Sequence, residues 1–161
     1  GWYCSCIRCR EVKNGCVNED TLVLRVRYYN ASNGEEYFIS FESDDTKVLY
    51  GFVRLRLTRY PAIYVFPELK GCAMIRELHV YGQLKSVSNN MGMGCGKVQN
   101  EGSITQHKGF GKKLMSKAEQ IAFKEGFTKM SVIAGEGTRE YYRKLGYIDS
   151  IGEGRFMIKE L

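Results

Sequence analysis

The first half of the chain alternates apolar and polar residues with the two-residue period of a half-buried β-strand. Residues 20–30, DTLVLRVRYYN, and residues 36–43, EYFISFES, both show this period. An Asn-Gly pair stands between them and such pairs favour tight turns, so the two stretches are predicted to form a β-hairpin. The same alternation predicts further strands at residues 48–60 and residues 72–82.

The second half of the chain changes to a helical period at residues 109–125. This period predicts a helix with one buried face and with lysines on its other faces. The expected buried face consists of Phe110, Leu114, Met115, Ala118, Ile121 and Ala122. Gly126 is a predicted helix stop. The elements expected after it are a buried strand at 129–135, a short helix at 138–146 with Thr138 as N-cap, and a closing hairpin at 147–161.

The predicted order of elements is four strands, a helix, a strand, a helix and two strands, which indicates an α/β protein. A helix between two strands commonly crosses over to make them parallel neighbours in one sheet. The length of 161 residues, of which 43% are hydrophobic, fits one globular domain with a sizeable core. No apolar run approaches the roughly 20 residues that a membrane-spanning helix needs, so no membrane partner is expected.

The chain is basic, with a formal net charge of +6, which suits an anionic partner such as a nucleotide or RNA. Arg54, Arg56 and Arg59 alternate along one predicted strand, and Arg25 and Arg27 do so on the preceding hairpin. Two interpretations stay open for these arginines. They form one cationic face that contacts phosphates, or they are ordinary solvated charge.

A glycine-broken loop, QHKGFG, leads into the predicted helix with Gln106, Gly109 and Gly111. A helix start presents unpaired backbone N–H groups and the positive end of the helix dipole, and glycines let an anion approach both. The loop follows a predicted strand and opens a helix, which is the context that a phosphate-binding loop needs. The alternative is a surface loop that only caps the helix.

The six cysteines include a dense C-x-C-x-x-C pattern at Cys4, Cys6 and Cys9. Three thiolates in one tight turn suit three of the four ligands of a tetrahedral zinc ion. Cys72 is the expected fourth ligand, with Cys16 and Cys95 as open alternatives. An iron–sulfur cluster needs similar thiolates, and free reduced thiols are the remaining possibility. The uneven spacing does not suit a disulfide framework, so a reducing, cytoplasmic location is expected.

Five stretches together resemble the GNAT acetyltransferases, and more narrowly the acetyltransferase domain of Elongator's catalytic subunit. They are RCREV (8–12), LYGFVRLRL (49–57), IRELHVYG (75–82), QHKGFGKKLMSKAEQIA (106–122) and GTREYYRKLGY (137–147). The resemblance implies the GNAT fold, an α/β arrangement with a mixed twisted sheet flanked by helices. It also implies that residues 17–161 form an acetyl-CoA-binding domain behind a cysteine-rich zinc-binding segment at residues 1–16.

The resemblance assigns roles to particular residues of this chain. The pyrophosphate of acetyl-CoA would be wrapped by Gly109, Phe110, Gly111 and Lys112, with Gln106 entering the loop. The pantetheine arm would lie along a strand that splays from its neighbour, at Glu77, Leu78, His79 and Val80. Tyr142 would face the thioester and donate a proton or hydrogen bond to the departing thiolate. Tyr141 would support the site, and His79 is a candidate general base whose alternative is a structural role.

The resemblance also implies a function in tRNA modification. Acetyl-CoA would supply the carbon unit of a 5-carboxymethyl group on the wobble uridine, with tRNA triggering its cleavage here. The 4Fe–4S cluster and S-adenosylmethionine would belong to a separate radical-SAM domain, and the absence of an initial Met suggests an excised domain. Two alternatives stay open: a lysine or small-amine N-acetyltransferase with Glu77 or His79 as base, and a non-catalytic, zinc-containing RNA-binding module.

Overall fold

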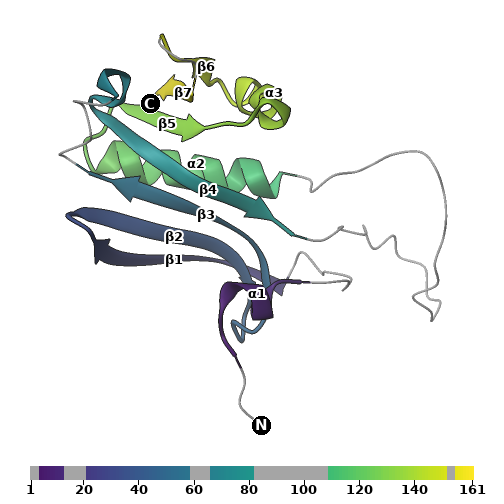
Figure 1. Cartoon of the computed structure of the whole chain (residues 1–161). Coiled ribbons are helices and arrows are strands. Elements are labelled where there is room, and N and C mark those ends of the chain that lie inside the picture. Colours follow the sequence, from purple (N-terminus) through teal and green to yellow (C-terminus); the bar gives the residue numbers. More distant parts are fainter. Residues whose placement is uncertain (1–3, 13–20, 59–65, 82–108, 152–154) are drawn as a thin grey trace, which may run out of the picture.

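The computed structural model describes residues 4–12, 21–58, 66–81, 109–151 and 155–161. Its described strands form one seven-stranded sheet in the order β1-β2-β3-β4-β5-β7-β6 (Figure 1). The strands are β1 (Leu22–Ala31), β2 (Gly34–Ser43), β3 (Leu49–Leu57), β4 (Cys72–Val80), β5 (Lys129–Ile133), β6 (Ile148–Asp149) and β7 (Phe156–Glu160). The helices are α1 (Ile7–Arg10), the 3-10 turn η2 (Pro67–Leu69), α2 (Phe110–Lys124) and α3 (Glu136–Lys144).

The topology confirms the α/β prediction and its crossover helix. Strands β1 to β4 pair as antiparallel neighbours, whereas β4 and β5 are parallel. Helix α2 connects these two parallel strands, as the order of periods predicted. The closing hairpin is also present, but β7 lies between β5 and β6 and therefore pairs with both.

Two local expectations differ from the structure. Helix α3 begins at Glu136 with Gly135 at the N-cap, so the prediction of Thr138 as N-cap was wrong. The Thr138 hydroxyl lies inside the first turn and donates to the Gly135 carbonyl oxygen at 3.0 Å. The short helix α1 was not predicted, because four residues are too few to show a helical period.

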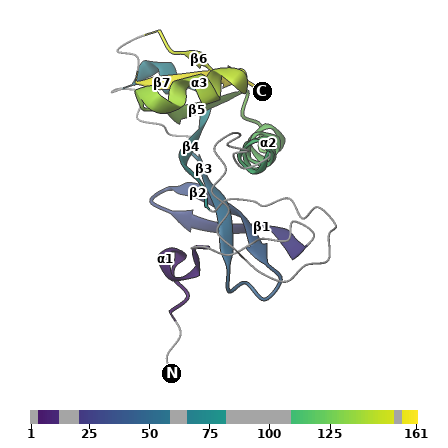
Figure 2. The same cartoon turned by 90° about the vertical axis from the view of Figure 1, so that its right-hand side faces the viewer.

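The core lies between the sheet and the apolar face of α2, which covers one side of the sheet (Figure 2). Leu114, Met115 and Ala118 are at most 1% exposed, and the predicted face is buried except for Ile121, which is only partly so. Burying one such leucine-sized side chain contributes about 1.5–3 kcal/mol. Gly126 ends the helix with a φ of 87°, a left-handed conformation that favours glycine.

The described helices were also compared with the length and apolarity that a membrane span requires. None of those in the described part of the chain is long and apolar enough to cross a bilayer.

Candidate active site

Strand β4 separates from β5 halfway along its length. The parallel pairing begins at Cys72 and Lys129 and ends at Ile75 and Val132, but β4 continues to Val80. On its other side β4 stays paired with β3 throughout this stretch. The edge of β4 from Arg76 to Val80 therefore faces the β5 side without a strand partner among the described residues. Its backbone groups on that edge are open to an extended ligand.

A β-bulge explains why the separation occurs at this point. Arg54 of β3 pairs with Glu77 of β4, and the next residue, Leu55, pairs with Ile75. Arg76 is therefore the extra residue, and a bulge of this kind bends its strand and increases the local twist. The bend begins directly after the last β4–β5 pair. The sequence signalled a strand here, but its alternation gave no sign of the bulge.

The N-terminus of α2 lies near this opening and has the features of an anion-binding helix start. Gly109 is its N-cap with a φ of 84°, and no side chain among the described residues caps the helix. Lys113 N–H donates the first helical hydrogen bond to the Gly109 carbonyl oxygen at 2.8 Å. The backbone N–H groups ahead of it lack helical acceptors, so the positive end of the dipole is open to an anion. Gln106 lies outside the described residues.

Three elements meet at Gly111 in the first turn of α2. A methyl group on Gly111 would collide with the Tyr141 hydroxyl and would lie 3.8 Å from Val80 Cγ2. Tyr141 belongs to α3 and Val80 ends β4, so this glycine is where the opening, α2 and α3 come together. The residues on either side of Gly111 differ in burial. Phe110 is buried with its ring 4.8 Å from that of Phe41, and Lys112 is exposed.

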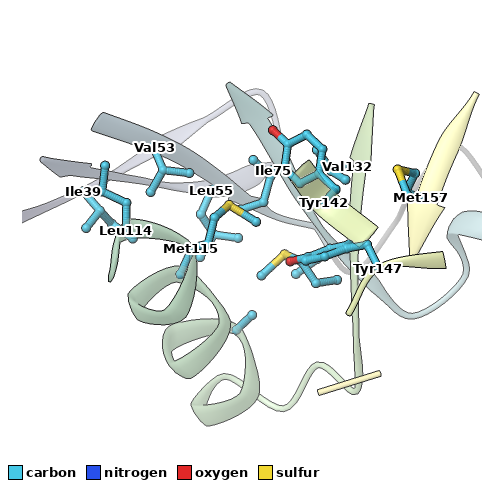
Figure 3. Close-up of a cluster of buried hydrophobic side chains, with 14 of the residues drawn as sticks. Ile39, Val53, Leu55, Ile75, Leu114, Met115, Val132, Tyr142, Tyr147 and Met157 are labelled. Atoms are coloured by element: carbon cyan, nitrogen blue, oxygen red, sulfur yellow. The ribbon is translucent and has the colours of Figure 1, made fainter. Parts of the chain in front are cut away.

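Tyr142 is buried at the point where β4 and β5 separate. It is 7% exposed, and Figure 3 shows it beside Ile75 and Val132, the last pair of the two strands. Burial, and to a lesser extent the neighbouring Tyr141, raises the pKa of Tyr142 to about 12. The phenol therefore keeps its proton at neutral pH and can act as a donor.

Tyr141 lies closer to the surface than Tyr142. It is 39% exposed, and its ring packs edge-on against that of Tyr142 at 5.3 Å. Burial raises the pKa of Tyr141 as well. The structure therefore gives the two adjacent tyrosines different positions. Tyr141 borders the start of α2, and Tyr142 lies deeper, at the opening of the sheet.

The predicted residues of β4 divide between the two faces of the sheet. Leu78 and Val80 pack against the core on the α2 face. Glu77 and His79 are on the opposite face, where His79 Nε2 lies 2.9 Å from Glu77 Oε1. The His79 ring also packs at a tilt against that of Phe52, with ring centroids 5.4 Å apart. His79 as a general base remains a prediction, whereas these contacts give it a structural role.

The cysteine cluster has the spacing that a metal ion requires. The sulfur atoms of Cys4, Cys6 and Cys9 lie within 4.8 Å of one another, and all three residues are exposed. Zinc–sulfur bonds of about 2.3 Å set tetrahedral thiolates roughly 3.8 Å apart, so the three fit one zinc ion. A hydrogen bond from the Cys9 backbone lowers the pKa of Cys6 to about 7, and the neighbouring Cys6 thiol raises that of Cys9 to about 11.

The structure places Cys72 away from the cluster, contrary to the expectation from sequence that it would be a fourth ligand. Cys72 is buried, with Sγ 3.6 Å from the Glu68 carbonyl oxygen, and it is not part of the cluster. It opens β4, whereas the cysteine segment joins the sheet through Glu11 and Leu49 at the start of β3. Because β3 and β4 are antiparallel, these points lie at opposite ends of the sheet. Cys16 and Cys95 lie outside the described residues.

Comparison with known proteins finds relatives of this chain and a solved structure of the same fold. The Acetyltransferase (GNAT) family matches residues 103–147, which include α2, β5 and α3. Elongator complex protein 3 of Dictyostelium discoideum is 38% identical over 164 residues. A tRNA uridine(34) acetyltransferase of Methanocaldococcus infernus is 39% identical over 168 residues.

These relatives are much longer than this chain. The matches cover 98% and 100% of this chain but 27% and 29% of the two relatives. A solved structure of M. infernus Elp3 with an N-terminal deletion superposes with a TM-score of 0.73 at 36% sequence identity. That match covers 98% of this chain and 35% of the other. The chain thus spans about a third or less of these proteins.

Proposed function

We propose that this chain, a GNAT domain, binds acetyl-CoA and cleaves its thioester as part of a tRNA-modifying enzyme. The premise is that the chain is homologous to part of Elongator complex protein 3 and of the archaeal tRNA uridine(34) acetyltransferases. The product of the whole enzyme would be 5-carboxymethyluridine at the wobble position of tRNA. The name of the archaeal relatives supports uridine 34 as the target. The chain acts in this scheme as the acyltransferase domain.

One observation carries the proposal: β4 separates from β5 after Ile75 and Val132, directly beside the open start of α2. The two parts suit the two ends of the coenzyme. The free edge of β4 from Glu77 to Val80 suits the amide groups of the pantetheine arm. Gly109, Phe110, Gly111 and Lys112, with Gln106, would bind the pyrophosphate through backbone N–H groups.

The buried phenol of Tyr142 supplies the acid for the cleavage step. Water adds its oxygen to the acetyl carbon and releases its two protons to solvent, and the carbon–sulfur bond breaks to leave acetate and the CoA thiolate. The departing thiolate takes a hydrogen bond or a proton from Tyr142, and solvent restores any proton that is transferred. A pKa of about 12 keeps the phenol protonated beforehand, and Tyr141 positions the ring through its edge-on contact.

The remaining parts of the enzyme lie outside this chain. Radical chemistry with a 4Fe–4S cluster and S-adenosylmethionine would belong to a companion radical-SAM domain of the same protein. Cys4, Cys6 and Cys9 would hold a structural zinc ion that organises residues 1–16 ahead of the GNAT domain at residues 17–161. The spacing of the three sulfur atoms supports this role. The uneven use of cysteine supports a cytoplasmic location.

A thiol-release assay tests the proposed function. The chain is mixed with acetyl-CoA and with tRNA, with a lysine-containing peptide, or with neither, and free CoA thiol and acetylated peptide are measured. We expect thiol release that depends on tRNA. Acetylated peptide would instead identify an amine acetyltransferase. If calorimetry detects no binding at millimolar acetyl-CoA, the proposed function is wrong and a non-catalytic module remains.

A further inference from the structure

The face of the sheet opposite α2 carries two buried carboxylates surrounded by arginines. We call the polar surface of β1 to β4 on this side the open face. The strand register identifies the residues that lie on this face: Arg27 pairs with Phe38, Phe38 pairs with Arg54, and Arg54 pairs with Glu77. Helix α2 packs against the other face, and α1 reaches the open face at one end (Figure 2). Directly paired residues on neighbouring strands point to the same side.

The first carboxylate, Glu36, is surrounded by three arginines from β3 and β4. Its side chain is 1% exposed, and Oε1 accepts from Arg56 at 2.9 Å and from Arg76 at 2.7 Å. A nitrogen of Arg54 lies 3.9 Å from Oε2. The partly exposed carboxylate of Glu77, next to this cluster, accepts a hydrogen bond from Arg54 at 3.4 Å. The β4 bulge makes this arrangement possible, because the extra residue in the strand is Arg76 itself.

The second carboxylate, Glu42, forms the same kind of cluster near α1. Its side chain is fully buried and accepts from Arg27 at 2.6 Å and from Arg10 at 3.2 Å. The Ser40 hydroxyl donates to it at 2.6 Å. Burial by itself would raise the pKa of Glu42, but the hydrogen bonds from Arg27 and Ser40 outweigh burial and lower that pKa.

These pairs leave the open face positively charged. In the ion pairs that the described residues form on this face, five guanidinium groups share the three carboxylates of Glu36, Glu42 and Glu77. The guanidinium groups are those of Arg10, Arg27, Arg54, Arg56 and Arg76. Their pairing with buried carboxylates argues against simple solvated charge, one of the two interpretations that the sequence allowed. Arg25 pairs with Asp44, and Arg59 lies outside the described residues. The buried acids hold the guanidinium groups in place while an excess of positive charge remains.

Arg27 and Arg76 can still contact a ligand. The side chain of Arg27 is 42% exposed and that of Arg76 is 44% exposed, although each is anchored by a buried carboxylate. A guanidinium group has five N–H donors, so one or two bonds to a carboxylate leave others available. Anchoring also lowers the conformational entropy that the side chain would lose on binding a phosphate.

Flat rings lie on the same face next to the arginines. His79 and Tyr81 are stacked with an interplanar angle of 10° and ring centroids 6.0 Å apart. Phe52 lies beneath them and is 1% exposed, so its ring supports the other two and is itself covered. Unpaired bases of single-stranded RNA stack on rings of this kind, and the adjacent phosphates pair with arginine.

We propose that the open face is a docking surface for the phosphate backbone of RNA, with Arg27 and Arg76 as phosphate contacts and the His79–Tyr81 stack as a base platform. The proposal rests on the proposed function, which makes tRNA the substrate of the whole enzyme. The excess positive charge favours a polyanion, and fixed guanidinium groups suit the bidentate geometry of phosphate. RNA bound here lies against β4, the strand whose free edge faces the coenzyme opening.

Fluorescence anisotropy with labelled tRNA tests this proposal on the chain. The test protein carries Arg27→Gln and Arg76→Gln, which leave Arg56 on Glu36 and Arg10 on Glu42. We expect affinity to fall at least about tenfold, and the slope of log affinity against log salt to become shallower by about two, since each phosphate contact contributes roughly 0.9. Lys70→Glu changes the net charge by the same amount at an exposed position before β4, and it should change affinity less than about twofold.

Three outcomes would separate the possibilities. Unchanged affinity and salt slope in a double variant with a wild-type melting temperature would overturn the proposal. Unchanged RNA binding combined with lost binding to the companion domain would overturn it as well, and would assign the face to a protein partner. Acetyl-CoA binding, measured by calorimetry on the Arg27→Gln single variant, should stay unchanged, because Arg27 lies in β1 away from the β4 edge. A wild-type chain that binds RNA but no acetyl-CoA would contradict the proposed function and would still support the RNA-docking surface.

Discussion

The hydroxyl group of Tyr141 fills the space above the α-carbon of Gly111. Any side chain at that glycine would meet this hydroxyl first and Val80 of β4 next. The glycine therefore serves two purposes. It leaves the first turn of α2 open to a ligand, and it lets α3 approach closely enough to set Tyr142 at the opening between β4 and β5.

Replacement of Gly111 by alanine should weaken acetyl-CoA binding by about tenfold or more, or about 1.4 kcal/mol. The added methyl group displaces Tyr141 and stands between the backbone N–H groups and the pyrophosphate. Isothermal titration calorimetry measures the affinity. Gly137→Ala in α3 is a matched control, because no atom of the described residues lies within 4 Å of its added methyl group. Equal affinities for the two variants would contradict the placement of the pyrophosphate.

Replacement of Tyr142 by phenylalanine should slow tRNA-dependent thiol release by about 10²-fold while leaving acetyl-CoA affinity within about twofold. The ring is kept, so packing is retained, and only the proton donor is lost. In the wild type the phenol should remain protonated up to a pH of about 12, so its ionisation should not reduce the rate between pH 7 and pH 9. Rates of thiol release across that range check both statements. A variant that keeps the wild-type rate would exclude Tyr142 as the acid.

The buried tyrosines should make the fold less stable at alkaline pH. Folding raises the pKa of Tyr142 from 10.0 to about 12, so the native state holds this proton more tightly than the unfolded chain. The stabilisation of the folded state by this raised pKa is complete below pH 10 and is lost as pH rises toward 12. Over this range the free energy of unfolding falls by about 1.4 kcal/mol per pH unit. Burial and Glu119 also raise the pKa of Tyr147, which adds to the effect.

Urea unfolding between pH 9 and pH 11 measures this dependence. Tyr142→Phe should flatten the fall in unfolding free energy above pH 10, because the variant has one buried phenol fewer to ionise. Tyr28→Phe changes a tyrosine that is 51% exposed and serves as the control. If both variants lose stability as steeply as the wild type, Tyr142 does not resist ionisation in the folded protein.

The cysteine cluster should carry zinc without Cys72. Freshly purified protein is expected to contain about one equivalent of zinc, and Cys6→Ser should lower this to less than about half. Cys72→Ser should keep the metal, because Cys72 opens β4 at the opposite end of the sheet from α1. Elemental analysis measures the content directly. Loss of zinc in Cys72→Ser but not in Cys6→Ser would contradict this assignment.

Much of the fold could be predicted from local spacing. The two-residue alternation located β1 to β4, and the helical period located α2 to within one residue at each end. Missed features were short or depended on backbone detail. Helix α1 has four residues, and the cap of α3 is the glycine before it and not Thr138. Neither leaves a periodic pattern in the side chains.

The candidate site was only partly predictable for the same reason. Gly109 and Gly111 signalled an open helix start, and the C-x-C-x-x-C turn signalled a cluster that the structure brings together. Both signals lie within a few consecutive residues. The bulge at Arg76 and the end of the β4–β5 pairing depend on the register between strands far apart in the chain. So does the different depth of the two adjacent tyrosines.

The sequence by itself determined most of the segments that become strands and helices, where a glycine begins a helix without a side-chain cap, and which cysteines share a turn. Periodicity and short-range geometry set each of these. Only the tertiary structure decided that Cys72 lies away from the cluster and that Glu36 gathers arginines from two other strands. Those outcomes depend on which residues the sheet register and the bulge place side by side. A buried carboxylate is stable only beside such partners, and no spacing along one strand reveals them.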